Sequence, residues 1–385
     1  MKSVIIGKNQ AGQRLDKFLH KYLPLAGDGF LHKMLRKKNI TLNGKKAEGK
    51  EILAINDQVC IFFSEETFAK FAGRDVGSPE GTHKTGNTAK ALHPGAESMD
   101  SPEKSRGDGG KLSAGMQNAA VPKPDQEYTQ AYESLDGITI LYEDDDCLIL
   151  NKPSGLLTQK AAPGDVSLNE WLIGYLLEKK QISAEELNFF RPSVCNRLDR
   201  NTSGIVLCGK SLAGLQYLSQ CVRERSVRKF YRTICVGALR ESAVIHGYLV
   251  KDEARNRVTV SPAIFSAGEK ASLIHTAYYP VAVTDAYTLL EVELITGKSH
   301  QIRAHLASLG HPLIGDYKYG QRSVNRTLKE QFCLEHHLLH ACRVTFPEAE
   351  SGPGRHLSGK TVSAPCPDNF RRLEEAFFLH PELYS

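Results

Sequence analysis

The sequence predicts an α+β protein with two folded parts, a small α/β unit at the N-terminus and a large C-terminal domain on a mixed, mainly antiparallel sheet. Three observations support this class. Helical and hairpin patterns fill residues 1–63, a polar stretch covers residues 64–135, and many strand-like segments with few helical ones fill residues 136–385. Many strands with few helices favour one large sheet covered by helices over a helical bundle.

Residues 1–63 are expected to form two helices and a small sheet. Apolar side chains recur at helical spacing over 12–25 and over 30–35, and Asn43-Gly44 is a hairpin turn signal. This unit holds 12 Lys and Arg against 5 Asp and Glu, so its net charge of +7 exceeds the +5 of the whole chain. A small basic unit indicates a polyanionic partner, most often nucleic acid, although a solvated lysine-rich face would give the same count.

Residues 64–135 differ in composition from the segments on either side. They are rich in Gly, Ser, Pro, Lys, Glu and Thr and show almost no aliphatic pattern. Such a segment cannot bury enough apolar surface to offset its conformational entropy. We therefore expect a flexible or disordered linker, long enough for the basic unit to bind its partner at a distance from the C-terminal domain.

The C-terminal domain begins where strand signals return. Strands are expected at 138–142, 147–150, 205–208, 231–236, 244–250, 258–260, 276–283, 287–295 and 338–346, and helices at 168–178, 211–224 and 369–377.

Bulk composition excludes several classes of protein. Hydrophobic residues make up 41% and charged residues 24% of the chain, as in an ordinary globular protein. No run of about 18 apolar residues occurs, so no membrane span is expected. Nine cysteines without a Cys-x-x-Cys pair favour the free thiols of a reduced, cytoplasmic protein over a disulfide framework or a zinc ribbon.

The most informative stretch runs from Asn196 to Gly204, where Asp199 lies between Arg197 and Arg200 just before an apolar strand. Neighbouring positive charge favours the ionised form of a carboxyl group. An ionised Asp at the mouth of a buried strand can act as a nucleophile or as a base. A structural salt bridge would use the same residues, and the tripeptide recurs at Arg14-Leu15-Asp16 inside a predicted helix.

Two other patterns invite different interpretations. Residues 204–211 match the phosphate-loop pattern G-x-x-x-x-G-K-[ST], but the four intervening residues are apolar and demand a buried strand, so we interpret the match as accidental. His336 and His340 have the spacing of a zinc-binding helix, yet no carboxylate stands between them. A metal site is therefore not expected.

Two further segments carry charge next to strands. Residues 228–232 interleave three cations with two aromatic rings, which suits a nucleic-acid surface as well as an ordinary basic strand start. A helix is expected to open after strand 287–295, with Gly297 at the turn. That placement would carry Arg303 toward a neighbouring carboxylate such as Asp199.

Several blocks occur along the chain in one order: Asn196–Gly204, Lys229–Tyr231 and Thr296–Arg303, preceded by 141–156 and followed by 310–316 and 338–341. They resemble the blocks of the RluA family of RNA pseudouridine synthases. Residues 12–63 resemble the S4 RNA-binding domain that precedes the catalytic domain in many members. The resemblance implies a pseudouridine synthase fold for residues 136–385, with residues 1–63 as an S4-like domain.

The resemblance implies an isomerase that converts uridine to pseudouridine in RNA without metal or cofactor. The target uridine must leave its stack before it can react. Asp199 would start cleavage of the N-glycosidic bond, either as a nucleophile or by removing a sugar proton, and the freed uracil would rejoin through C5. Arg197 would fill the space left by the flipped base, Tyr231 would pack on the base, and Arg303 would pair with Asp199 and keep it ionised.

The implied partner of this protein, expected to be a monomer, is RNA. Large-subunit ribosomal RNA is the first candidate, tRNA is the alternative, and a non-catalytic RNA-binding protein of the same fold is the rival function. Further RNA contacts are expected in the catalytic cleft and on the N-terminal unit, from Lys152, Lys229, His300, Gln301, Arg14, Lys33, Arg36 and Lys37. Two positions depart from the family pattern, Asn196 where His is usual and Lys298 where Arg is frequent, and Lys lacks the bidentate fork of Arg.

Overall fold

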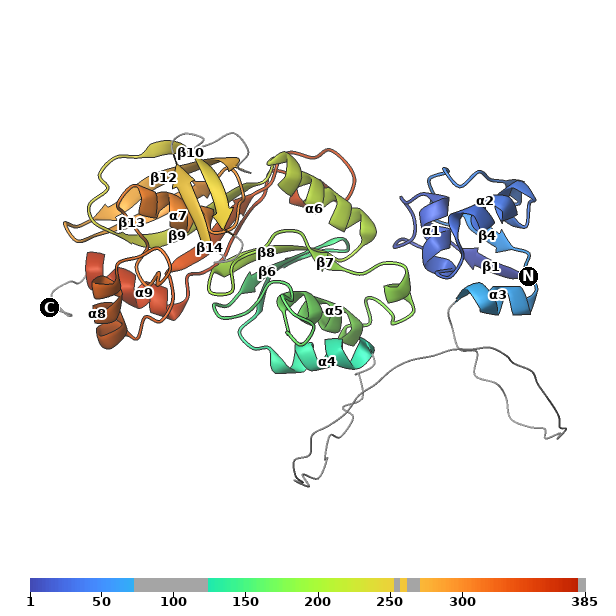
Figure 1. The fold of residues 1–385 in the computed structure, drawn as a ribbon, viewed down its shortest axis with the longest axis horizontal. Helices are drawn as coiled ribbons and strands as arrows, with labels where there is room; N and C mark the ends of the chain where they lie inside the picture. Colours follow the sequence, from blue (N-terminus) through green and yellow to red (C-terminus); the bar gives the residue numbers. More distant parts are fainter. Residues whose placement is uncertain (73–123, 253–256, 262–270, 380–385) are drawn as a thin grey trace, which may run out of the picture.

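A computed structural model describes residues 1–72, 124–252, 257–261 and 271–379 (Figure 1). The N-terminal part and the C-terminal domain each have hydrophobic clusters of their own. Within the described residues, no helix is long and apolar enough to cross a membrane.

The N-terminal part is a four-stranded antiparallel sheet, with the strand order β1-β4-β2-β3, together with three helices. Its elements are β1 (Lys2–Ile5), α1 (Leu15–Tyr22), α2 (Asp28–Arg36), β2 (Ile40–Leu42), β3 (Lys45–Lys46), β4 (Gln58–Ile61) and α3 (Glu65–Ala72). Helix α1 is shorter than the predicted 12–25 because Pro24 disfavours helical backbone at Leu23, which closes the helix. Leu15, Phe18 and Leu19 of α1 are buried in the core of this part.

Helix α3 lies in the segment that we expected to be a linker. Ala72 is buried, and Phe68 and Phe71 pack against the same core as α1 and α2. The folded N-terminal part therefore extends past residue 63, because these apolar residues complete its core. Most of the expected linker, residues 73–123, lies outside the described residues.

The other end of the expected linker is also folded. Helix α4 (Pro124–Ser134) packs along α5 (Leu168–Glu178), and Ala131 is fully buried. Gly174 permits this close approach, since a Cβ atom there would lie 2.1 Å from the backbone oxygen of Tyr128. The C-terminal domain thus recruits a helix that the polar composition did not predict.

An eleven-stranded mixed sheet forms the C-terminal domain, with the main order β11-β10-β12-β13-β9-β14-β8-β6-β5. Its strands are β5 (Thr139–Glu143), β6 (Cys147–Lys152), β7 (Ser193–Val194), β8 (Ser203–Gly209), β9 (Arg228–Val236), β10 (Ala243–Asp252), β11 (Arg257–Ser261), β12 (Ala271–Val283), β13 (Tyr287–Leu294), β14 (Leu339–Thr345) and β15 (Thr361–Ser363). All pairs are antiparallel among the described strands except β14 with β8. The predicted α+β class with a large, mainly antiparallel sheet is confirmed.

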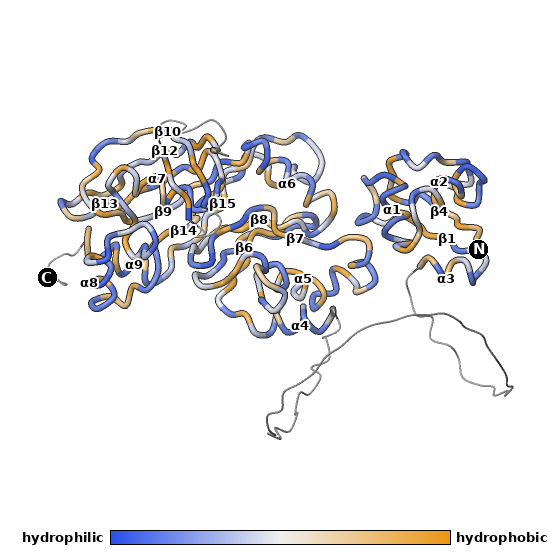
Figure 2. The backbone as a smooth tube through the Cα atoms, in the orientation of Figure 1, coloured by the Kyte–Doolittle hydropathy of each residue, from blue (hydrophilic) through white to orange (hydrophobic). Residues whose placement is uncertain are grey.

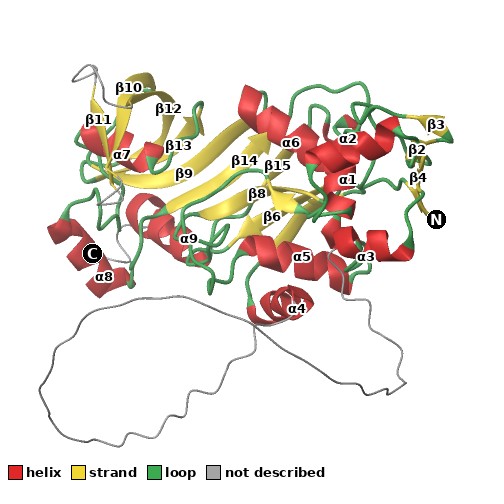
Figure 3. Cartoon of the chain, turned by 45° about the vertical axis from the view of Figure 1, so that its right-hand side comes forward, coloured by secondary structure: helices red, strands yellow, loops and turns green. Residues whose placement is uncertain are grey.

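Helices cover this sheet along its length (Figure 3). Besides α4 and α5 they are α6 (Leu212–Glu224), α7 (Gln301–Ser308), α8 (Arg322–Phe332) and α9 (Asp368–Glu374), with short helical turns at Glu186–Asn188, Arg355–Leu357 and Glu375–Leu379. Helix α6 contacts β6 and β8, whereas α7 contacts β11 and β12 toward the opposite end. In the strand order, β13, β9 and β14 lie between the strands that α7 contacts and those that α6 contacts.

The buried strand β8 excludes a phosphate loop at the position of the sequence match. All of its residues are buried, and hydrophobic colouring follows β6 and β8 through the middle of the domain (Figure 2). Gly204 has φ +109°, and a Cβ atom there would lie 2.3 Å from the backbone oxygen of Ala341 on β14. Residues 204–209 therefore form a core strand, as their apolar side chains predicted, and no phosphate loop exists at this position.

The N-terminal part contacts the C-terminal domain through an aromatic cluster. Phe189 stacks on Phe18 and Tyr22 of α1, with ring centroids 5.8 and 5.7 Å apart. Beside it, Lys8 Nζ lies 3.1 Å from Asp146 Oδ1. The N-terminal part therefore packs directly against the C-terminal domain.

Candidate active site

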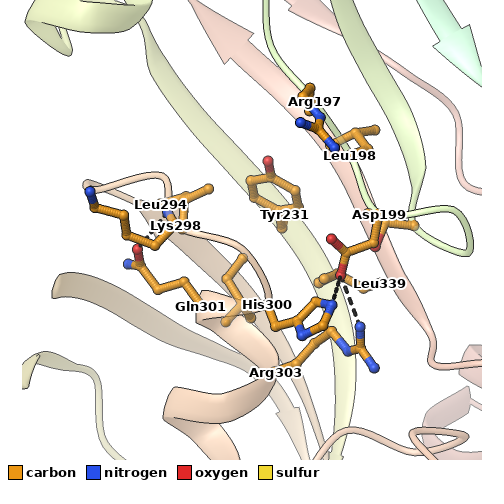
Figure 4. Close-up of a pocket in the computed structure, with 12 residues that line it drawn as sticks. Arg197, Leu198, Asp199, Tyr231, Leu294, Lys298, His300, Gln301, Arg303 and Leu339 are labelled. Carbon is orange, nitrogen blue, oxygen red and sulfur yellow. Dashed lines mark hydrogen bonds and ion pairs between the residues drawn. The ribbon is translucent and has the colours of Figure 1, made fainter. Parts of the chain in front are cut away.

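Three segments that are far apart in sequence meet near the middle of the sheet. Asp199 lies in the loop between β7 and β8, Tyr231 lies on β9, and Arg303 lies on the first turns of α7. Strand β14 pairs with both β8 and β9, which brings the loop of Asp199 next to Tyr231. Figure 4 shows the three side chains around one pocket.

Arg303 bridges two carboxylates. Its Nη1 donates to Asp199 Oδ2 at 2.9 Å, and its Nε and Nη2 donate to the two oxygens of Asp316 at 2.7 and 3.0 Å. The Asp316 side chain is 0% exposed, that of Arg303 is 9% exposed, and that of Asp199 is 28% exposed. The guanidinium is therefore anchored on its buried side and presents its remaining edge to Asp199.

Asp316 is a functional residue that our site prediction missed. Burial alone would raise the pKa of Asp316, but the Arg303 guanidinium and the backbone N–H of Lys318 hold it below its usual value. Asp316 thus stays ionised and fixes the orientation of Arg303. The block 310–316 pointed to this position, but nothing in its spacing showed that the carboxylate is buried.

Tyr231 borders the pocket as a neutral phenol. It is only 5% exposed. Burial raises its pKa well above the ordinary value, and the Asp199 carboxylate acts in the same direction. A neutral aromatic ring of this kind can stack on a planar base without carrying charge into the pocket.

The pocket is an open hollow of about 360 Å³, a volume that includes space open to solvent. Its lining combines charged groups with an apolar wall that includes Tyr231 and Leu339. Arg197 and Lys298 are exposed at its border, Arg197 near Tyr231 and Lys298 on the opposite side (Figure 4). A planar base that enters this hollow would therefore meet an aromatic ring, a carboxylate and two exposed cations.

Lys152 does not lie where we expected it. It is 0% exposed, and its ammonium donates to the backbone oxygens of Pro153, Leu156 and Arg200 at 2.9, 2.8 and 3.0 Å. The expectation that Lys152 contacts RNA is wrong, because all three of its donors are used inside the protein. It instead ties the end of β6 to the residue that follows Asp199.

Three further side chains, those of Asn196, His337 and His340, hold the loop that contains Asp199. Asn196 accepts the N–H of Leu207 at 2.7 Å and donates to the Ile205 oxygen at 3.3 Å. His337 and His340, one of them from the rejected zinc pair, hydrogen-bond the hydroxyls of Thr202 and Ser203, both at 2.9 Å. These contacts position the turn between Asp199 and β8. In the described part of the chain, no group of three or more His, Cys, Asp or Glu is arranged to hold a metal ion.

The three remaining residues that we expected to contact RNA in the cleft are Gln301, His300 and Lys229. Gln301 lines the pocket but is 2% exposed, and its amide is used by Thr296, Thr276, the Lys298 N–H and the His275 oxygen. Its contact with RNA stays a prediction. His300 borders the pocket with Nε2 3.8 Å from Asp199 Oδ2. Lys229 lies two residues before Tyr231 on β9 and is 8% exposed, so its contact with RNA stays a prediction.

On the N-terminal part, the predicted RNA contacts are exposed. Lys33 and Arg36 lie on α2, and Lys37 directly follows this helix. Arg14 precedes α1 and forms an ion pair with Asp16 in the same segment. Their role in binding RNA stays a prediction.

Comparisons with known proteins show which family the chain resembles. A family model described as RNA pseudouridylate synthase matches residues 146–308. The ribosomal large subunit pseudouridine synthase D of Neisseria meningitidis serogroup A is 30% identical over 282 residues, which cover 71% of this chain and 70% of that protein. The ribosomal large subunit pseudouridine synthase C of Vibrio vulnificus is 29% identical over 344 residues, covering 89% of this chain and 87% of that protein.

Two more comparisons extend the picture. The tRNA pseudouridine synthase C of Salmonella typhimurium is 32% identical over 225 residues, covering 56% of this chain and 82% of that protein. The solved structure of human RNA pseudouridylate synthase domain containing 4 superposes with a TM-score of 0.51 at 22% identity, covering 65% of this chain and 96% of that one. At this identity the superposition shows a shared fold and nothing further.

Proposed function

The chain belongs to the RluA family of RNA pseudouridine synthases, and on that premise we propose that it isomerises specific uridines of large-subunit ribosomal RNA with Asp199 as the catalytic residue. The enzyme is an isomerase, and its substrate is RNA. Two of the relatives described above are named for the large ribosomal subunit and span most of this chain. A third is named for tRNA and covers a smaller share of it, so tRNA is the alternative substrate.

The proposed reaction rearranges one bond and loses no atoms. The bond between C1′ and N1 of the flipped uridine breaks, the uracil turns, and a bond between C1′ and C5 forms. C5 then loses its proton and N1 gains one, so the product is an isomer of the substrate. Asp199 starts the first step either by attacking C1′ or by taking a sugar proton.

One observation carries this proposal: an ionised Arg303 anchored by Asp316 presents its free edge to Asp199 at the border of an open pocket that Tyr231 also lines. An opposite charge at this distance favours the carboxylate form that either mechanism needs. Tyr231 offers a neutral ring for the base, and the exposed Arg197 can occupy the gap that the base leaves in the RNA.

The N-terminal part, proposed as an S4-like RNA-binding domain, supplies affinity for structured RNA. Its core is small, but its surface carries the exposed cations Lys33, Arg36 and Lys37. Cations on a surface bind phosphates without reading sequence. All residues of the proposed site come from one chain, and we propose that the enzyme acts as a monomer in the cytoplasm.

The test is turnover of RNA carrying [5-³H]uridine, in which tritium release reports loss of the C5 proton. Asp199→Asn should lower the single-turnover rate by about a thousandfold or more, because the side chain can no longer serve as nucleophile or base. Folding should persist, since Arg303 keeps both bonds to Asp316. The matched control is Asp285→Asn, whose carboxylate is fully exposed.

Unchanged turnover in Asp199→Asn would overturn the assignment of the catalytic residue. RNA binding without tritium release by the unmodified enzyme, on both ribosomal and transfer RNA, would favour the non-catalytic alternative. Tritium release from tRNA but not from large-subunit RNA would overturn the choice of substrate and leave the chemistry standing.

A further inference from the structure

Tyr319, in the segment between α7 and α8, is not used by the proposed mechanism, yet it contacts Arg303 and Asp316 of the site and residues of β11. Its ring centroid lies 5.3 Å from the guanidinium carbon of Arg303 and 5.3 Å from that of Arg257. Its hydroxyl oxygen accepts the backbone N–H of Val258 on β11 at 3.0 Å, and its own N–H donates to Asp316 at 3.1 Å. These contacts hold the backbone, the ring and the hydroxyl of Tyr319.

His300 links Tyr319 to the catalytic carboxylate. Its Nδ1 lies 2.9 Å from the Tyr319 hydroxyl, and its Nε2 lies 3.8 Å from Asp199 Oδ2. The residue stands directly before α7 with φ +55°, a left-handed conformation that is uncommon outside glycine. Such conformations persist where the surroundings demand them, and they cluster at functional sites.

The hydrogen-bond donors along this path can be assigned. The roles in the bond between Tyr319 and His300 depend on the histidine tautomer; since the Tyr319 oxygen already accepts one hydrogen from Val258, its own hydrogen can be donated to Nδ1 of His300. A neutral imidazole that accepts at Nδ1 carries its hydrogen on Nε2. In this tautomer, His300 points an N–H group at Asp199.

The charged groups around His300 act in both directions. Burial lowers the pKa of His300, Asp199 and Asp316 oppose this, and Arg303 and Lys318 act with burial. The net direction is downward, so the ring is neutral near pH 7.

We propose that Tyr319 and His300 are positioning residues that hold Asp199 through its Oδ2 atom and leave Oδ1 as the oxygen that reacts. Oδ2 accepts Arg303 Nη1 at 2.9 Å and faces His300 Nε2. In the described part of the chain, no hydrogen bond or ion pair reaches Oδ1. Figure 4 shows both interactions meeting at one oxygen, while the other faces the side of Tyr231.

This proposal rests on the proposed catalytic role of Asp199. The separation of 3.8 Å is longer than a hydrogen bond. Catalytic hydrogen bonds are often long in the free enzyme and tighten when the substrate is bound. We therefore expect His300 Nε2 to come within hydrogen-bonding distance of Asp199 Oδ2 when RNA fills the pocket.

The first experiment reads the tautomer of His300 directly. Full-length enzyme labelled with ¹⁵N-histidine is studied by long-range ¹H–¹⁵N NMR near pH 7.5, and the His300 signals are assigned by their loss in His300→Asn. The proposal expects hydrogen on Nε2 in the unmodified enzyme. In Tyr319→Phe, which removes the hydroxyl and keeps the ring over Arg303, it expects a mixture of the two tautomers.

The second experiment follows the reaction. Tyr319→Phe should lower the single-turnover rate by about three- to tenfold, the effect of losing one positioning hydrogen bond, with RNA affinity unchanged. The matched control is Tyr317→Phe, an exposed tyrosine of the same segment, which should change neither readout.

Hydrogen on Nδ1 of His300 in the unmodified enzyme would overturn the proposal, and so would a Tyr319→Phe single-turnover rate equal to that of the unmodified enzyme. These failures are distinct from failure of the proposed function. If Asp199→Asn is inactive while Tyr319→Phe matches the unmodified enzyme, the proposed chemistry stands and the positioning role of Tyr319 and His300 does not. If Asp199→Asn stays active, the proposed function itself fails.

Discussion

The tripeptide Arg-Leu-Asp occurs twice in this protein, and the two copies have different surroundings. In the N-terminal part, Arg14 precedes α1 and pairs with Asp16, two residues away, in an exposed position. In the C-terminal domain, Arg197 stands at the border of the pocket, and Asp199 pairs instead with Arg303, 104 residues further along the chain. The partner from a distant segment, and not the tripeptide, makes the second carboxylate a candidate for catalysis.

The largest difference between the two copies should appear when the cation is removed. Arg303→Met should lower turnover by about a hundredfold or more, because the group that orients Asp199 is lost. It should also destabilise the fold by about 3–5 kcal/mol, because the buried Asp316 loses its partner. Urea unfolding and tritium release measure the two effects.

Arg14→Met is the matched control for this experiment. Its pair with Asp16 is exposed, so stability should change by less than about 1 kcal/mol and turnover on a short RNA should not change. The double variant Arg303→Met, Asp316→Leu should recover part of the stability and none of the activity. Equal effects of Arg303→Met and Arg14→Met would contradict the comparison.

Acid should destabilise the region around the pocket in a defined window. Burial lowers the pKa of His337 to about 4, Arg303 acts in the same direction, and the nearby carboxylates of Asp316 and Asp199 oppose. In the unfolded chain the imidazole of His337 is protonated near pH 6.5, whereas in the folded protein it is protonated only near pH 4. The unfolded state therefore binds more protons between these values, so stability is full above pH 6.5 and falls toward pH 4.

This contribution amounts to about 1.4 kcal/mol for each unit of pKa difference. His337→Gln can still hydrogen-bond Thr202 but does not titrate. Its free energy of unfolding should fall less steeply between pH 6.5 and 4, measured by urea unfolding at several pH values. Parallel curves for the two proteins would show that His337 does not titrate as its burial requires.

Lys152 offers a smaller test, because it acts through hydrogen bonds and not as a contact to RNA. Lys152→Met should destabilise the fold by about 1–3 kcal/mol, since three backbone oxygens lose their donor. Turnover should fall with RNA affinity unchanged, because Lys152 holds the residue next to Asp199. The matched variant Lys298→Met, at the exposed border of the pocket, should weaken RNA binding and leave stability unaltered.

The smallest effect on folding, and a distinct effect on binding, is expected from the basic surface of the N-terminal part. Replacing Lys33, Arg36 and Lys37 together by Gln should reduce the slope of log affinity against log salt by about 2–3, one counterion for each lost phosphate contact. Stability and turnover at saturating RNA should stay the same. The control is Lys45→Gln with Lys46→Gln, on the exposed hairpin strand β3. An unchanged slope would argue against the proposed RNA-binding surface.

Part of the fold followed from local patterns. Alternating and continuous apolar runs predicted strands such as β8, because a residue's hydrophobicity and the backbone period decide which face it buries. The patterns missed α3, α4 and α8. Helix α8 carries Val324, Leu328 and Phe332 at helical spacing, a signal that was available, whereas α3 and α4 lie in polar sequence and gain their stability from packing.

The candidate site divides in the same way. Asp199, Tyr231 and Arg303 were found because their blocks are recognisable in the sequence. Lys152 and Gln301 were assigned to RNA because they are polar residues inside those blocks. The structure shows that their polar atoms are used by backbone and side-chain groups within the protein.

The amino-acid sequence by itself determined the class of fold, the family and the chemical groups available for catalysis, since these depend on residue types and on their short-range order. Only the tertiary structure decided which carboxylate each cation meets. It gave Arg303 to both Asp199 and Asp316, and it buried Lys152 under the loop that Asp199 occupies. The physical reason is that burial and ion pairing depend on distances between segments that only folding brings together, so one tripeptide forms a local ion pair at Asp16 and a long-range one at Asp199.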